Sequence, residues 1–138
     1  MLEAFGSASV QQVSNMRAIP LAEWTAFDVK ADALTASVTI AAVPGMRHVI
    51  RSLHATLSVN GAAPVFNAGV LLSFGAVPIF EPHMSVNAPN APSDAPIQLT
   101  GLEIAAPVNT AITWTFTTAA IANIVETCFI AGYSIPAR

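Results

Sequence analysis

The feature that most constrains the fold is an uncharged stretch, NTAITWTFTTAAIANIV, which runs from Asn109 to Val125. Within it, Ile112, Trp114 and Phe116 alternate with threonines. Alternation at period two places the large apolar side chains on one face of a strand and the threonines on the other. A membrane-spanning helix would not separate them in this way. Residues 111–118 are therefore predicted to form a half-buried β-strand.

A second stretch without Asp, Glu, Lys or Arg covers residues 52–80. Prolines, glycines and asparagines divide it into pieces of strand length, so it does not predict a membrane helix either. The rest of the chain repeats the pattern of short alternating runs bounded by Pro, Gly or Asn. Strands are expected at residues 34–43, 46–59, 70–74, 77–80, 97–104 (interrupted at Gly101) and 124–135, in addition to 111–118.

This pattern predicts an all-β protein, an antiparallel jelly-roll-type sandwich of about eight strands with no helix. On the longest strand, Val49, Leu53, Leu57 and Val59 are expected to share one face. Residues 1–23 lack a sustained period and are expected to form an extended N-terminal arm, so the compact domain is placed at residues 24–138, beginning with Trp24, Phe27 and Val29. The arm carries isolated apolar residues that we expect to contact a partner, namely Leu2, Phe5, Val10, Val13, Met16 and Ile19.

The composition indicates self-association. The chain has 138 residues, of which 54% are hydrophobic and only 9% are charged. A soluble monomer normally covers its surface with more charged side chains, so we expect a homo-oligomer, with a trimer as the favoured state. The net charge of −3 and the absence of a basic run argue against nucleic acid as a partner, and no membrane partner is expected. The single Cys128 and the lack of a signal peptide suit assembly in a reducing cytoplasm.

Residues able to carry chemistry are few and scattered. No motif for nucleotide binding, metal-dependent hydrolysis or nucleophilic catalysis occurs. His48 and His54 are expected on the same side of one strand but about 20 Å apart, too far to share a metal ion. We expect no catalytic, cofactor or metal site, a buried unreactive thiol at Cys128, and Glu126 at a rim or interface, paired with an arginine.

The proline-rich segment of residues 81–96 is predicted to be a long surface loop. It contains the remaining candidate contact residues, which are Glu81, His83, Asn87, Asn90 and Asp94.

Two stretches resemble a known group of proteins. LTASVTIAAVPGMRHVIRSLHATLSVNGAAP, at residues 34–64, resembles the opening strands of small all-β virion proteins of tailed phages and prophages. GLEIAAPVNTAITWTFTTAA, at residues 101–120, and FIAGYSI, at residues 129–135, resemble the end of those proteins. The arm and the proline-rich loop have no counterpart in that group.

The resemblance implies a jelly-roll subunit for head decoration, a head fibre or the tail, present as an oligomer on the particle surface. The expected function is therefore that of a non-enzymatic structural protein, assembled in the host cytoplasm into a virion, with itself and the major capsid protein or other virion proteins as partners. One alternative is a receptor- or glycan-binding jelly-roll module that uses the 81–96 loop, although the loop lacks Trp and Tyr. A second is a small cupin-like enzyme, which would need three converging metal ligands.

Overall fold

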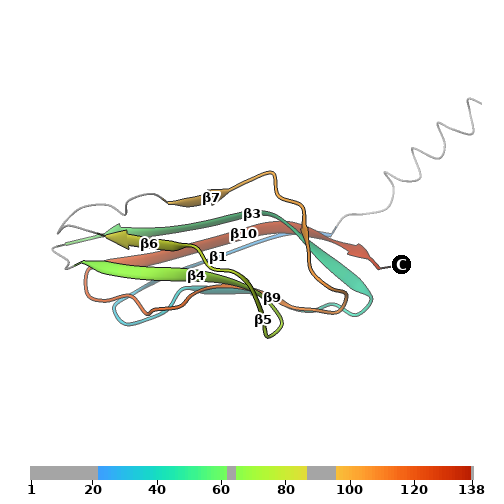
Figure 1. Ribbon diagram of the computed structural model, residues 1–138, viewed down its shortest axis with the longest axis horizontal. Helices are drawn as coiled ribbons and strands as arrows, with labels where there is room; N and C mark the ends of the chain where they lie inside the picture. The colour runs from blue at the N-terminus through green and yellow to red at the C-terminus, as the bar shows by residue number, and fades with distance from the viewer. Residues whose placement is uncertain (1–21, 62–64, 87–95, 138) are drawn as a thin grey trace, which may run out of the picture.

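The computed structural model describes residues 22–61, 65–86 and 96–137 of the chain. Within these ranges there is no helix, and ten strands form two antiparallel sheets of five strands each. Figure 1 shows the two sheets as the layers of a sandwich. The expected all-β sandwich is thereby confirmed.

The first sheet is built around two long strands, β3 (Met46–Val59) and β10 (Ile124–Pro136), which pair with each other. The other side of β10 pairs with β1 (Ala22–Ala31) without a register shift. The other side of β3 pairs with two short strands, β7 (Ile97–Leu99) and β8 (Ile104–Ala105). β1 therefore forms one edge of this sheet, and β7 and β8 form the other.

The second sheet has the order β2 (Ser37–Ile40), β9 (Ile112–Phe116), β4 (Phe66–Phe74) and β5 (Val77–Phe80). A further short strand, β6 (His83–Val86), also pairs with β4. β2 forms one edge of this sheet, and the short strands β5 and β6, each paired with β4, form the other.

The core between the sheets is centred on β9, as its alternation predicted. Ile112, Trp114 and Phe116 are buried, and the threonines between them are half-buried. The Trp114 indole N–H donates a 3.0 Å hydrogen bond to the backbone oxygen of His54, across the sandwich on β3. A buried indole N–H needs an acceptor, and this bond supplies one while linking β9 to β3 across the core.

A β-bulge in β3 corrects one expectation about its faces. Ser52 pairs with Ala131 and Ile50 pairs with Gly132, so Arg51 is an extra residue without a partner. An extra residue reverses the alternation of side chains along a strand. Ile50 consequently joins the core with Leu53, whereas Val49 does not, and the expected shared face of Val49 and Leu53 is wrong.

The proline-rich segment is less irregular than expected. Residues 83–86 form β6, with Met84 and Val86 buried against the core. Their alternation with His83 and Ser85 is a strand pattern too short to stand out among the prolines of residues 81–96. The prediction of an unbroken surface loop is therefore wrong at β6, and residues 87–95 lie outside the described residues.

Other boundaries differ in smaller ways. The expected strand at residues 34–43 is reduced to β2, and the expected strand at residues 97–104 is split into β7 and β8. Gly101, between those two strands, has φ +69°, a left-handed conformation that interrupts pairing. β1 begins at Ala22, two residues before the expected start of the compact domain.

Candidate assembly surface

The two histidines of β3 do not form a chemical site. His48 is buried, with Nδ1 2.6 Å from the Ser134 hydroxyl and Nε2 2.8 Å from the backbone oxygen of Ala41. His54 lies on the outer face, where its ring meets the ring of Phe129 edge-on at 5.4 Å. The expectation that both face the same side is wrong, because the bulge at Arg51 separates them. Across the described ranges, no three His, Cys, Asp or Glu side chains are grouped as metal ligands require.

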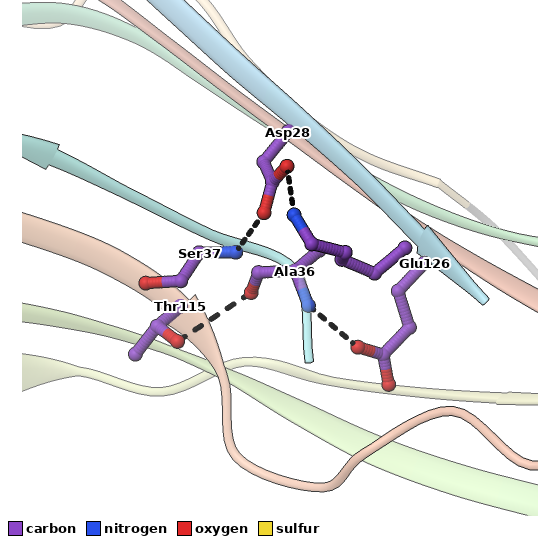
Figure 2. Close-up of polar contacts among 6 residues, drawn as sticks. Asp28, Ala36, Ser37, Thr115 and Glu126 are labelled. Carbon is purple, nitrogen blue, oxygen red and sulfur yellow. Dashed lines mark hydrogen bonds and ion pairs between the residues drawn. The ribbon is translucent and has the colours of Figure 1, made fainter. Parts of the chain in front are cut away.

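Glu126 is in the core, which corrects its expected place at a rim or interface. Figure 2 shows its carboxylate accepting a 3.1 Å hydrogen bond from the backbone N–H of Ala36, in the segment that leads into β2. Its side chain is 0% exposed, and Oε2 has no hydrogen-bond partner. Desolvation by burial raises the pKa of Glu126 to about 7, although the Ala36 bond acts in the opposite direction. This carboxylate therefore links β10 of the first sheet to the segment that leads into β2 of the second sheet.

Asp28 makes a second link between the sheets, also visible in Figure 2. It accepts a 3.0 Å hydrogen bond from the backbone N–H of Ser37 at the start of β2, and its other oxygen is 2.5 Å from Lys30 Nζ. The hydrogen bonds from Lys30 and Ser37 lower the pKa of Asp28. The open side of β2 is thereby partly satisfied by a side chain of β1.

Cys128 is buried on the core face of β10, as expected. Desolvation, together with the nearby Asp28 carboxylate, raises the pKa of its thiol to about 12. The thiol therefore stays protonated at neutral pH, and the protonated form is a poor nucleophile.

The candidate contact residues of the proline-rich segment are only partly described. Glu81 Oε2 lies 3.3 Å from His83 Nε2, with both side chains well exposed. Such an exposed pair has little effect on stability. Asn87, Asn90 and Asp94 lie outside the described residues. So do the arm residues, which are Leu2, Phe5, Val10, Val13, Met16 and Ile19.

The outer face of the first sheet carries an apolar row that points away from the core. Phe27 on β1 is 72% exposed and Val29 is 50% exposed. Phe27 lies opposite Phe129 on β10, and Phe129 lies opposite His54 on β3. Aromatic side chains collected on one open sheet face are typical of surfaces that contact another protein.

A polar cluster adjoins this row at one end of the same face. Tyr133 donates a 2.9 Å hydrogen bond to Glu103, and the guanidinium of Arg51 lies 4.9 Å from the centre of the Tyr133 ring. The bond to Glu103 raises the pKa of Tyr133. Beside the cluster is a shallow hollow of about 370 Å³. It is lined by Arg51, Ser52, Thr100, Gly101, Leu102 and Glu103.

The sequence pattern did not reveal this surface, because alternating apolar residues normally face the core, whereas those of β1 face outward. In AFDVK, the apolar Phe27 and Val29 point outward, whereas Asp28 and Lys30 lie opposite the core residues Cys128 and Glu126. Phe27 and Val29 were expected only to begin the compact domain together with Trp24, and no face of a strand was predicted for them. The one feature of the sequence that pointed to such a surface was the scarcity of charged residues. It predicted that some surface is covered by another chain, but not which residues form it.

Comparison with known proteins gives no family. No family model matches the sequence, and no curated protein matches it either. The described residues contain no helix long and apolar enough to cross a membrane.

Proposed function

We propose that the protein is a non-enzymatic structural subunit of a tailed-phage-like particle, an oligomeric capsid-decoration or virion-surface protein. The observation that carries this proposal is the exposed apolar row of the first sheet, which lies beside a long edge strand in a chain with few charges. Apolar surface of this kind is stable in water when another protein covers it. A subunit that is covered by its own copies and by the particle meets that requirement.

The strand order supports the jelly-roll form of the proposal. Pairing is nested along the chain: β1 pairs with β10, β2 with β9, β3 with β7 and β8, and β4 with β5 and β6. Winding a long antiparallel hairpin into two facing sheets would produce such nesting, as the proposed jelly roll requires. Jelly rolls also serve as lectins and enzymes, so the connectivity alone does not select a virion role.

The proposed partners are copies of the chain, with a trimer as the favoured state, and the major capsid protein or another virion protein. The N-terminal residues 1–23 are the proposed docking arm, because they carry spaced apolar residues in an otherwise polar segment. The proposed location is the virion, after assembly in the host cytoplasm. The buried free thiol of Cys128 suits a reducing compartment.

A glycan-binding module is the second candidate, and the hollow beside Tyr133 favours it. There an aromatic ring lies beside the carboxylate of Glu103 and the guanidinium of Arg51, a combination that the 81–96 loop lacks in its sequence. If this hollow binds a sugar, Tyr133→Ala should abolish binding on a glycan array without changing the melting temperature. A wild-type chain that binds no glycan at millimolar concentration would remove this candidate.

The virion proposal is tested by sedimentation of particles from cells that carry the gene. The chain should co-sediment with particles in a density gradient, in a fixed ratio to the major capsid protein. A variant lacking residues 1–19 should melt near the wild-type temperature but be lost from the particles. Absence of the full chain from all particle fractions would refute the virion role, and full incorporation of the shortened chain would refute the docking arm.

A further inference from the structure

The four edges of the sandwich differ in how well they are protected against another strand. An open edge offers unpaired backbone N–H and C=O groups, and proteins normally blunt it with short strands, proline or bulges. β5 has four residues, includes Pro78 and pairs with β4 through a register shift. β2 has four residues and is partly satisfied by Asp28, and β7 has three residues.

β1 is not protected by shortness, proline or a bulge, although charged side chains also blunt edges and β1 carries Glu23, Asp28 and Lys30. It is ten residues long, contains no proline and pairs with β10 in unbroken register. Among the described residues it has one strand partner, so its other side is open. Its positive charge, Lys30, is engaged by Asp28 within the same chain. β1 is therefore the edge of this molecule best suited to accept another strand.

The sequence of β1 is also complementary to itself. A two-fold axis perpendicular to the sheet keeps the outer face of one copy beside the outer face of the other. Two residues can then be opposed only if their numbers are both odd or both even, because side chains alternate between the faces of a strand. Centring the axis on Phe27 places it opposite the partner's Phe27 and places Thr25 opposite the partner's Val29. The charged Glu23, Asp28 and Lys30 then each face an uncharged residue. Centring it on Asp28 would oppose two carboxylates, and centring it on Ala26 would place Val29 opposite a glutamate.

We propose that two copies of the chain associate through their β1 strands, antiparallel around a two-fold axis at Phe27, so that their first sheets form one continuous sheet. The occupant of the open edge is thus a second copy of the same strand, an isologous contact. The two Phe27 side chains pack together on the outer face, flanked by Phe129 of each copy. This inference rests on the proposed self-assembling function, for which it names the contact. Trimers would use the contact to join one trimer to another.

The register can be tested by disulfide cross-linking of the full-length chain. Directly opposed residues of antiparallel strands have Cα atoms about 4.5–5.5 Å apart, which a disulfide can bridge. Phe27→Cys should therefore cross-link to itself under mild oxidation. Because Phe27→Cys removes the central contact, a second pair keeps Phe27 intact: Thr25→Cys mixed with Val29→Cys should cross-link, whereas each alone should not.

Val77→Cys is the matched control, because Val77 is also an exposed valine on an edge strand, β5 (60% exposed). Wild-type chain, with its buried Cys128, reports the background. Cross-linking at the opposed positions should be on the order of a hundredfold faster than for Val77→Cys, because pairing raises the effective concentration from micromolar to millimolar.

The possible outcomes separate this inference from the virion proposal. Equal rates for all variants, or self-linking of Thr25→Cys alone, would overturn the β1 contact even if the chain is found on particles. Cross-linking that occurs only after residues 1–19 are removed would overturn it too, since the edge would then be occupied by the chain's own N-terminal segment. Cross-linking in the expected register supports it whether or not the chain is found on particles.

Discussion

The inner and outer faces of the first sheet are made of similar side chains but face different surroundings. On β10, Cys128 and Ile130 are fully buried against the second sheet, while their neighbour Phe129 is half-buried on the outside. On β1 the contrast is stronger, because Phe27 is largely exposed while Asp28 lies toward the core. Folding of one chain accounts for the apolar inner face and leaves the apolar outer face unexplained. The difference supports the proposal that the inner face determines stability, whereas the outer face and edge determine association.

The largest expected contrast is in thiol reactivity at adjacent positions of β10. Cys128 points inward, and burial raises its pKa to about 12, whereas residue 127 points outward. In the variant Thr127→Cys, the new thiol should react with iodoacetamide on the order of a thousandfold faster than Cys128, which must wait for opening of the fold. Peptide mapping by mass spectrometry measures both rates in one sample. Similar rates would show that the inner face is not closed.

Removal of the central core side chain should have the largest effect on stability. Trp114→Ala should lower the free energy of unfolding by roughly 3–5 kcal/mol, because it leaves a cavity between the sheets and removes the hydrogen bond to the backbone oxygen of His54. Denaturant titration of the dissociated chain measures this change. An unchanged denaturation midpoint would contradict the assignment of Trp114 to the interior.

The buried carboxylate should make stability depend on pH. The folded-state pKa of Glu126, about 7, lies above its ordinary value of 4.5. Its contribution is therefore complete below pH 4.5 and is lost as the pH rises through 7. The free energy of unfolding should fall by roughly 3 kcal/mol between pH 4.5 and 8, at about 1.4 kcal/mol per pKa unit.

Glu126→Gln should flatten that dependence. The amide oxygen can still accept the Ala36 hydrogen bond, and no charge has to form in the core. Unfolding titrations at pH 5 and pH 8 for both proteins provide the comparison. An equally steep pH dependence in Glu126→Gln would assign the effect to another titrating group.

Substitutions on the outer face should have the smallest effect on stability. Phe27→Ser and Val77→Ser should each change the free energy of unfolding of the dissociated chain by less than about 0.5 kcal/mol, because both side chains are mostly exposed. Melting curves in dilute solution measure this. A loss as large as that of Trp114→Ala would mean that the outer face belongs to the fold of the single chain.

The sequence predicted those features that depend on alternation over several residues. The bounds of β3 were expected from the turn residues on either side of it, the inward face of β9 from its period-two alternation, and the burial of Cys128 from its apolar neighbours. Alternation does not record an inserted residue, so the bulge at Arg51 and its effect on Val49 and His54 were missed. It also does not state which face is inside, so Glu126 was placed at a rim.

The candidate surface was less predictable than the fold. Phe27 and Val29 are ordinary strand residues, and their exposure depends on β1 lying at an edge, which only the pairing of distant strands determines. The low charge of the chain predicted self-association, but the composition does not show which part of the surface would be involved. The contact residues expected in the arm, and Asn87, Asn90 and Asp94, lie outside the described residues and stay predictions.

The most direct test of the central claim is the mass of the full-length protein in solution, measured by light scattering over a range of concentrations. The wild-type chain should exceed the single-chain mass of 14.3 kDa. Phe27→Asp should shift it toward 14.3 kDa, because two carboxylates would face each other at the axis, while Val77→Asp should leave it unchanged. A wild-type mass of 14.3 kDa at every concentration, or dissociation by Val77→Asp and not by Phe27→Asp, would contradict the assignment of association to the outer face and edge of the first sheet.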